Sequence, residues 1–213
     1  NYCKEGFYSL CDNYSYYGSR TEGAMADYIK VCPNNLLKLP DSVSYEEGAM
    51  VDPAANAIHG LWRGNFRKGD SIVVFGLGAI GLFGVQFARE LGAETFGLDT
   101  SGSPEAQNQL VLMMNKRGRI VYLGISNAAL TLSKESVNRL LRYEIGIYGS
   151  WNSFSKPFPG REWTYALELM EQRKLQALPI ISHRFGLDEA PAVFQKIRNK
   201  EIAFNKIMFF PGG

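Results

Sequence analysis

One segment constrains the fold of this chain more than any other: an apolar strand, a glycine-rich turn and an apolar helix that follow one another without interruption. Residues 72–75 read Ile-Val-Val-Phe, residues 76–81 read Gly-Leu-Gly-Ala-Ile-Gly, and residues 82–91 form an apolar run of helical length. A second apolar strand then ends at Asp99. This order of strand, Gly-x-Gly-x-x-Gly turn, helix and strand with a terminal acid predicts a dinucleotide-binding unit.

Each glycine of the turn has a separate predicted role. Gly76 permits the tight turn, Gly78 lets the backbone approach a pyrophosphate, and Gly81 lets the helix pack closely on the strand. The phosphates are expected to lie against the first N–H groups of the helix, at Ala79 and Ile80, where the helix dipole also favours negative charge. A glycine-rich turn without a ligand is the less favoured alternative.

Asp99 is the predicted partner of the adenosine ribose, because it lies near the ~20-residue offset at which an acid accepts the ribose hydrogen bonds. A carboxylate there repels a 2′-phosphate, so we predict NAD in preference to NADP. Gly124 and Ile125, at the end of a later strand, are expected to face the crevice in which such sheets bind ligands.

From Lys68 onward, predicted strands and helices alternate. The strands are predicted at 71–75, 94–98, 119–124 and 144–149, and the helices at 79–91, 104–115, 134–142 and 161–173. Ser103 and Ser133 are predicted to cap two of these helices. The pattern predicts the α/β class, with a doubly wound parallel dinucleotide-binding sheet.

The two ends of the chain differ from this middle part. Residues 1 to about 50 are rich in Tyr, Gly and Asn, with short β-like pieces such as 26–31, and predict a loop-rich β region, while 43–60 looks partly helical. The last predicted elements are a strand at 181–185, a helix at 188–198 and a strand at 207–210. We expect the last segment to return to the first domain, which gives the predicted domains 1–54, 55–180 and 181–213.

The junction after Thr100 is too short for a complete six-stranded dinucleotide fold. The chain goes straight to Ser101 and a helix, and loss of whole βα units from the middle of a sheet leaves an uncovered edge. We therefore expect a missing segment between residues 100 and 101, with Cα atoms farther apart than the ~3.8 Å of a trans peptide. The chain begins without a methionine, and we expect its true beginning to lie upstream.

Composition is that of an ordinary folded protein, with 46% hydrophobic and 21% charged residues. A net charge of +2 without a long basic block gives no support for nucleic-acid binding, and no apolar run approaches the ~20 residues of a membrane span. Three cysteines and no signal-peptide pattern favour a reducing cytoplasm.

Further motifs span nearly the whole length of the sequence. They lie at 2–11, 17–20, 51–53, 149–152 and 159–163, in addition to the glycine turn. Through these motifs the chain resembles the zinc-dependent medium-chain dehydrogenases, and within that family the polyol branch. The resemblance implies a GroES-like, β-rich catalytic domain, incomplete in this chain, beside the dinucleotide-binding domain.

The resemblance also implies two zinc ions. Cys3 and Cys11 have the spacing that ends a structural zinc lobe of four thiolates, although two such cysteines alone are more often core or loop residues. Asp52 corresponds to an acid, usually Glu, that lies at the catalytic zinc as a ligand or through a water; a helix-capping or surface carboxylate is the alternative. The cysteine and the His-Glu pair that complete the catalytic site do not occur in this sequence, so either they lie upstream or the protein does not catalyse. Cys32 fits no ligand spacing and is predicted to be a small buried residue.

Two smaller predictions concern polar residues. Ser19 and Arg20 follow a glycine and are candidates for an anion-binding nest with a guanidinium, which suits a phosphorylated polyol, while a polar loop is an equal alternative. His59 and His183 have no second ligand at metal-binding spacing and are predicted to be structural.

By this resemblance the chain is an oxidoreductase that transfers hydride between NAD and a sugar alcohol, with zinc as Lewis acid. The favoured substrate is a phosphorylated hexitol such as galactitol 1-phosphate, which gives tagatose 6-phosphate; a non-phosphorylated polyol or threonine is the alternative. The alternative of another class is a non-catalytic NAD(P)-binding protein without catalytic zinc. We expect a cytoplasmic homodimer or homotetramer that binds a small polyol or polyol phosphate, no nucleic acid and no membrane.

Overall fold

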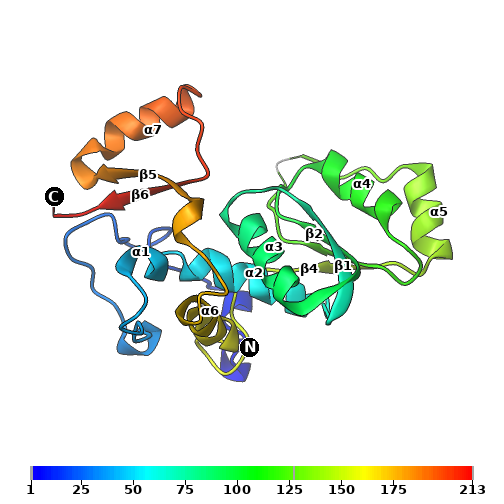
Figure 1. Ribbon diagram of the computed structural model, residues 1–213, viewed down its shortest axis with the longest axis horizontal. Coiled ribbons are helices and arrows are strands. Elements are labelled where there is room, and N and C mark those ends of the chain that lie inside the picture. The colour runs from blue at the N-terminus through cyan, green and yellow to red at the C-terminus, as the bar shows by residue number, and fades with distance from the viewer. Residues whose placement is uncertain (1, 127, 213) are drawn as a thin grey trace.

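The computed structural model describes residues 2–126 and 128–212, with the backbone alone described from 90 to 95. A four-stranded sheet with its helices lies at one side of the molecule, and a two-stranded sheet with one helix lies at the other (Figure 1). Helices α2 (Val51–Arg63) and α6 (Arg161–Glu171) lie between them and pack on each other. None of the described helices has the length and apolar character that a membrane span requires.

The larger sheet is parallel throughout, as predicted. Its strands, in spatial order, are β1 (Gly69–Phe75), β2 (Gly92–Asp99), β3 (Arg119–Tyr122) and β4 (Gly146–Gly149). The helices between them are α3 (Ala79–Leu91), α4 (Pro104–Met113) and α5 (Lys134–Arg142). The predicted α/β alternation is therefore confirmed.

Two of these helices begin at the serines that the sequence predicts. Ser103 Oγ accepts a hydrogen bond from Ala106 N at 3.3 Å, and Ser133 Oγ accepts one from Ser136 N at 3.0 Å. A side-chain acceptor at this position satisfies one of the N–H groups that the first helical turn leaves without a partner.

Side chains alternate between the two faces of the sheet, because successive residues of a strand point in opposite directions. On one face Phe96, Leu98 and Val121 belong to a core shared with α2 and α3. On the other face Ile120 packs in a second core with Leu110 of α4. Helices thus cover both faces, which confirms the doubly wound arrangement.

The link from β2 to α4 is the unusual connection of this sheet. The strands follow one another in one direction across the sheet, yet α3 and α4 cover opposite faces. The crossover from β1 to β2 and the crossover from β2 to β3 therefore have opposite hands, whereas nearly all crossovers between parallel strands are right-handed. Within this turn Thr100 N donates to Phe75 O at 2.8 Å and Ser101 N donates to Asp99 Oδ1 at 2.9 Å. The expected missing segment between residues 100 and 101 stays a prediction.

The amino-terminal part is as rich in loops as predicted, but its β pieces are not found. Among residues 2–44 the structure shows three 3-10 turns, Tyr2–Glu5, Tyr8–Leu10 and Pro33–Asn35, and an isolated bridge between Tyr17 and Thr21. Residues 26–31 form bends and coil, because no neighbouring strand supplies a hydrogen-bonding ladder for them. The predicted helical character of 43–60 is confirmed by α1 (Tyr45–Gly48) and α2.

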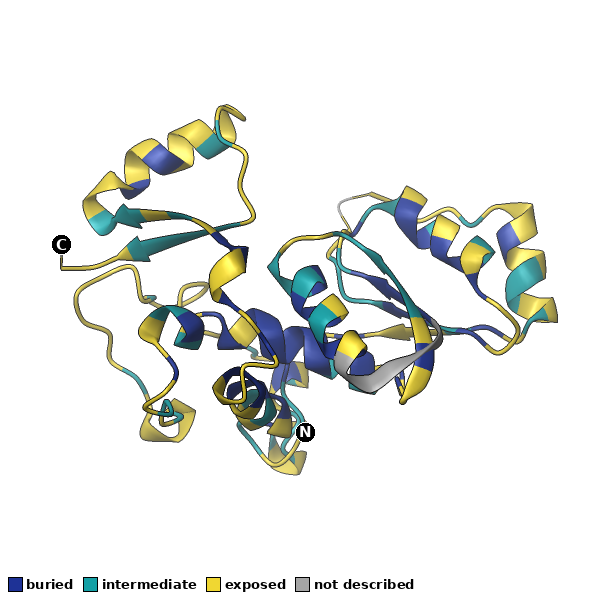
Figure 2. Cartoon of the chain, viewed as in Figure 1, coloured by how far each residue is buried: buried dark blue, intermediate teal, exposed yellow. Residues whose placement is uncertain are grey.

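The carboxyl-terminal elements also follow the prediction. Strands β5 (Ile181–Gly186) and β6 (Lys206–Phe210) pair in parallel, and a 3-10 turn at Leu187–Glu189 leads into α7 (Ala190–Arg198). Helix α2 is buried along most of its length, whereas α7 is largely exposed (Figure 2). The predicted boundary at 54/55 falls inside α2, and the division into three domains stays a prediction.

Candidate functional site

The glycine turn lies at the carboxyl end of β1, against the turn that follows β2. Gly76 has a φ of +89°, which favours glycine, and its carbonyl oxygen accepts a hydrogen bond from Thr100 Oγ1 at 2.8 Å. A Cβ added at Gly81 would lie 1.9 Å from that same carbonyl oxygen. The close packing predicted for Gly81 is therefore present in the structure.

The space beside Gly78 is open. A Cβ added at Gly78 would meet no atom within 4 Å, and Gly78 O accepts from Leu82 N at 2.9 Å at the start of α3. The first N–H groups of a helix, here at Ala79, Ile80 and Gly81, have no acceptor within the helix itself. Open space in front of a helix N-terminus suits an anionic group, so the turn fits the phosphates of a dinucleotide.

Asp99 does not extend toward this space. The residue is 0% exposed, and its carboxylate accepts hydrogen bonds from Ser101 Oγ at 2.6 Å, from Gln107 Nε2 at 2.9 Å and from Gly102 N at 3.2 Å. The strand ends at this acid as the sequence predicts, but the acid binds its own chain. Contact with a ribose requires the carboxylate to leave some of these donors.

Gly124 and Ile125 follow β3 at the same edge of the sheet. Gly124 N donates to Asp99 O at 3.0 Å, which ties the end of β3 to the end of β2. Ile125 is 71% exposed. The structure thus brings these predicted residues to the carboxyl edge that carries the glycine turn, and their contact with a cofactor stays a prediction.

Asp52 lies in the first turn of α2; the residue as a whole is exposed, while other protein atoms partly surround its carboxyl group. The N-cap of α2 is Met50, so the capping alternative for Asp52 does not apply. Surrounding protein atoms desolvate the carboxyl and raise its pKa, while the charge of Lys206 and a hydrogen bond from Asn56 act in the opposite direction. Asn56 Nδ2 lies 3.2 Å from Asp52 Oδ1.

Tyr14 and Asn152 form a polar pair near Asp52 that the sequence did not reveal. Asn152 Nδ2 donates to Tyr14 Oη at 2.6 Å, across 138 residues of sequence. Burial raises the pKa of the Tyr14 hydroxyl, and the charges of Tyr16 and Asp52 raise it further. A contact between residues so distant leaves no local signal in the sequence.

The two cysteines of the predicted zinc lobe lie together. A hydrogen bond with the Cys11 side chain raises the pKa of the Cys3 thiol, and both are free cysteines. In the part of the chain that the structure describes, no three His, Cys, Asp or Glu side chains are placed to hold a metal ion. Cys3 and Cys11 therefore fit half of a four-thiolate site, and Asp52 belongs to no set of three such ligands among the described residues. Cys32 is exposed, which corrects the prediction that it is buried, because its backbone N–H is bound to Tyr17 Oη on an open loop.

Ser19 and Arg20 lie on an exposed loop. Gly18 N donates to Thr21 O at 3.1 Å, and Ser19 N donates to Tyr16 O at 3.3 Å, so these backbone donors are bound within the loop. The Arg20 guanidinium donates to the carbonyl oxygen of Tyr14. The polar-loop alternative describes this geometry better, and a role in substrate binding stays a prediction.

Both histidines lie in contacts that suit a structural role. His59 Nδ1 lies 2.6 Å from Glu162 Oε1, between α2 and α6. The His183 ring stacks on Phe185 with centroids 6.0 Å apart, and its Nδ1 lies 2.9 Å from Ser182 Oγ.

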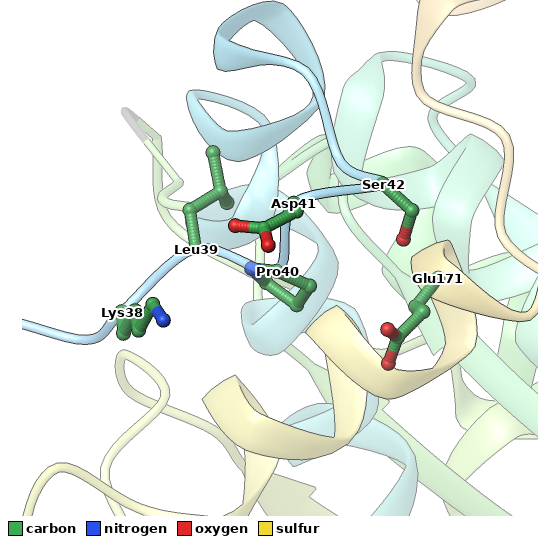
Figure 3. Close-up of a pocket in the computed structure, with 6 residues that line it drawn as sticks. All are labelled: Lys38, Leu39, Pro40, Asp41, Ser42 and Glu171. Carbon is green, nitrogen blue, oxygen red and sulfur yellow. The ribbon is translucent and has the colours of Figure 1, made fainter.

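A separate hollow lies where the segment before α1 meets the end of α6 (Figure 3). It is lined by Lys38, Leu39, Pro40, Asp41, Ser42 and Glu171. The lining carries charges of both signs, and the predicted site residues are not among it. We therefore leave this hollow out of the candidate site.

The comparisons with known proteins agree with this geometry. No family model matches the chain. It is 28% identical to galactitol 1-phosphate 5-dehydrogenase of Escherichia coli strain K12, over 92% of this chain and 70% of the relative. The crystal structure of galactitol-1-phosphate dehydrogenase from Escherichia coli has a TM-score of 0.89 and 26% identity, over 95% of this chain and 71% of that one. The relatives of this chain are zinc-binding medium-chain dehydrogenases.

Two further medium-chain dehydrogenases extend the comparison. D-arabitol-phosphate dehydrogenase of Enterococcus avium is 25% identical over 92% of this chain and 67% of the relative. A zinc-binding dehydrogenase from Sinorhizobium meliloti 1021, bound to NADP, shares the fold with a TM-score of 0.85 and 23% identity, over 98% of this chain and 72% of that one. The alignment to the Escherichia coli K12 dehydrogenase extends over 242 residues, more than this chain contains, so the dehydrogenase has segments without a counterpart here.

Proposed function

We propose that this chain is an NAD-linked dehydrogenase that transfers hydride between the cofactor and a sugar alcohol. The preferred substrate is a phosphorylated hexitol such as galactitol 1-phosphate, with tagatose 6-phosphate as the product. The open face of Gly78 at the N-terminus of α3 carries the proposal, because it offers helix N–H groups to a pyrophosphate. Two of the relatives reported above are named for phosphorylated polyols, which supports the substrate class.

The cofactor would be held along the carboxyl edge of the sheet. Its phosphates would lie against residues 78–81, and Gly124 and Ile125 would border the remainder. The negative charge of Asp99, even when bound to its own turn, disfavours a 2′-phosphate nearby and supports NAD over NADP. The NADP-bound relative shares the fold at 23% identity and does not decide the coenzyme of this chain.

Zinc enters the proposal through the cysteine pair and Asp52. Cys3 and Cys11 would supply two thiolates to a structural zinc, and a catalytic zinc near Asp52, bound directly or through water, would polarise the substrate hydroxyl. The described residues gather no complete ligand set at Asp52, so we derive no step through that metal. The chain itself contributes a carboxylate held by Asn56 and a nearby phenol–amide pair, Tyr14 and Asn152, which suit the hydroxyl groups of a polyol.

Turnover assays test the proposal. The full chain is supplied with NAD or NADP and with galactitol 1-phosphate, sorbitol or threonine, and reduced cofactor is followed by absorbance. We expect the highest kcat/KM for galactitol 1-phosphate with NAD. A preference for sorbitol or threonine contradicts the phosphorylated substrate and supports the alternative dehydrogenases.

A non-catalytic NAD-binding protein is the second candidate, favoured by the incomplete ligand set around Asp52 among the described residues. Zinc analysis of the complete protein separates the two. About two zinc ions per chain support the enzyme, whereas one or none, together with intact NAD binding, supports the non-catalytic protein.

We further propose a homodimer or homotetramer that acts in the cytoplasm. One of the two outer strands of the parallel sheet, β4, exposes Ile147 and Tyr148, which supports association of its edge with a second copy. Light scattering of the purified protein tests this expectation, and a monomer at micromolar concentration contradicts it.

A further inference from the structure

The carboxylate of Glu162 binds two separate parts of the molecule at once. Glu162 is 1% exposed and lies in the first turn of α6. One oxygen, Oε1, accepts from His59 Nδ1 at 2.6 Å, and the other, Oε2, accepts from Ser155 Oγ at 2.8 Å. It therefore joins α2 to the loop of residues 151–160, which we call the 151–160 loop.

The loop is shaped around this carboxylate. Gly160 has a φ of +104°, and a Cβ added there would lie 2.7 Å from Glu162 Oε2. The backbone N–H of Ser155 also points to Oε2, at 3.4 Å. Glycine at position 160 thus leaves the room that the carboxylate needs beneath the loop.

The other end of the 151–160 loop reaches the candidate substrate site. Asn152 Nδ2 donates to Tyr14 Oη at 2.6 Å, and Tyr14 is close enough to Asp52 for the carboxylate charge to raise the pKa of its hydroxyl, after the larger effect of burial. Asn152 has a φ of +57°, a left-handed conformation that asparagine adopts more readily than most residues.

Two buried hydroxyl groups, one directly before this loop and one within it, support a functional role. The Oγ atoms of Ser150 and Ser153 are buried and have no hydrogen-bond partner among the described residues. A buried hydroxyl without a partner is costly and is found where a water, a ligand or a mechanism accounts for it. Ser153 within the loop and Ser150 directly before it thus carry buried hydroxyl groups that no hydrogen bond among the described residues accounts for.

We propose that Glu162 is a positioning residue for the dehydrogenase reaction: it holds the 151–160 loop on α2 so that Asn152 and Tyr14 form the wall that binds the hydroxyl groups of the polyol beside Asp52. This inference rests on the proposed function. Glu162 itself lies behind the loop and acts through Asn152, since both of its oxygens are bound to His59 and Ser155.

Apolar contacts keep the loop folded when the polar contact is weakened. Phe154 stacks on Trp163 with centroids 6.2 Å apart, and Trp163 Nε1 donates to Ser153 O at 3.1 Å. Phe158 packs edge-on against Tyr8 with centroids 5.3 Å apart. A conservative variant at position 162 is therefore expected to shift the loop without unfolding the chain.

The test compares Glu162→Gln with a matched control, Glu47→Gln. Glu47 is also a buried carboxylate in the first turn of a helix and is paired with Arg173, but among the described residues it forms no hydrogen bond or ion pair with the 151–160 loop. For Glu162→Gln we expect the KM for galactitol 1-phosphate to rise ~10-fold or more, with an unchanged dissociation constant for NADH by fluorescence titration. Glu47→Gln should leave both constants unchanged.

A double variant tests whether the effect passes through Asn152. Asn152→Ala alone should raise the same KM, and Glu162→Gln combined with Asn152→Ala should be no worse than the stronger single variant. The proposal is overturned if the KM increases of the two single variants multiply in the double variant. It is also overturned if Glu162→Gln has a normal KM while Asn152→Ala has a raised one. If Glu162→Gln does not fold, Ser155→Ala removes one bond of the same carboxylate and is judged by the same criteria.

A readout without turnover separates this inference from the proposed function. Limited cleavage by chymotrypsin after Trp151 and Phe154 reports how firmly the loop is held, and we expect faster cleavage in Glu162→Gln than in Glu47→Gln. Equal rates overturn the positioning role. A wild-type chain that turns over neither galactitol 1-phosphate, sorbitol nor threonine overturns the proposed function instead.

Discussion

Residues 69–149 and residues 2–44 are held in place by different kinds of contact. In the first region, strands β1 to β4 form a parallel ladder with an apolar core on each face. In the second, aromatic and cationic side chains fix irregular backbone against the 151–160 loop, as Lys156 does over the Phe7 ring at 4.3 Å. The cofactor region therefore follows local rules of strand and helix, whereas the region with Cys3, Cys11, Ser19 and Arg20 depends on long-range contacts.

The largest expected effect is a loss of stability caused by a substitution in the cofactor region. Gly81→Val places a side chain where a Cβ alone would lie 1.9 Å from Gly76 O, and we expect a loss of about 3 kcal/mol in the free energy of unfolding. Urea unfolding measures it. Gly78→Ala, which enters open space, is the control and should cost less than about 1 kcal/mol. Equal stability of the two variants contradicts the packing described for the turn.

The next effect concerns the contact between α2 and α6, two helices that lie outside both regions. Glu162→Ala leaves His59 without its buried partner and should cost about 3 kcal/mol at neutral pH. Burial acts to raise the pKa of Glu162, but hydrogen bonds from His59, from its own backbone N–H and from Ser155 prevail and lower it below 4.5. The stability that the ionised carboxylate contributes is therefore complete above pH 4.5 and is lost as the pH falls through the lower folded-state value. Urea unfolding at several pH values should show a difference between wild type and variant that shrinks in acid, and a constant difference contradicts this.

A third prediction separates chemistry from cofactor binding. Asp52→Asn should lower kcat for galactitol 1-phosphate by ~10- to 100-fold, because the carboxylate lies at the candidate substrate site and not at the glycine turn. The dissociation constant for NADH should not change. Asp41→Asn, in the hollow of Figure 3, is the control and should behave as wild type. Weaker NADH binding in Asp52→Asn contradicts the separation of the candidate substrate site from the cofactor region.

The smallest effect comes from an exposed ion pair. The Arg173 side chain is 62% exposed, so its pairing with Glu47 at 2.7 Å is screened by solvent, and Arg173→Ala should cost about 0.5 kcal/mol. Thermal unfolding measures this cost. A loss above about 2 kcal/mol would show that this pair stabilises the region before α2 more than a surface contact can.

Local sequence signals predicted the sheet region well. Helix α5 begins and ends where its apolar spacing and the cap at Ser133 place it, because both signals act within one or two turns. The strand at 26–31 was predicted from the same kind of local pattern and is absent, since a strand also needs a neighbour that the pattern does not reveal.

The candidate site was predicted less completely than the fold. Asp99 ends its strand as predicted, but its burial by Ser101 and Gln107 depends on how the following turn folds back. The pairs Tyr14–Asn152 and His59–Glu162 join residues 138 and 103 positions apart, and neither spacing has a sequence signature. The resemblance to known dehydrogenases identified Cys3, Cys11 and Asp52 as candidate site residues. The contacts that position the 151–160 loop could be identified only from the structure.

Calorimetric titration of NADH into the full chain tests the central claim most directly. We predict saturable heat, at least ~10-fold weaker binding of NADPH because of the charge at Asp99, and loss of binding in Gly78→Val, whose side chain would occupy the space proposed for the pyrophosphate. No saturable heat with either coenzyme, or undiminished binding in Gly78→Val, would contradict the account.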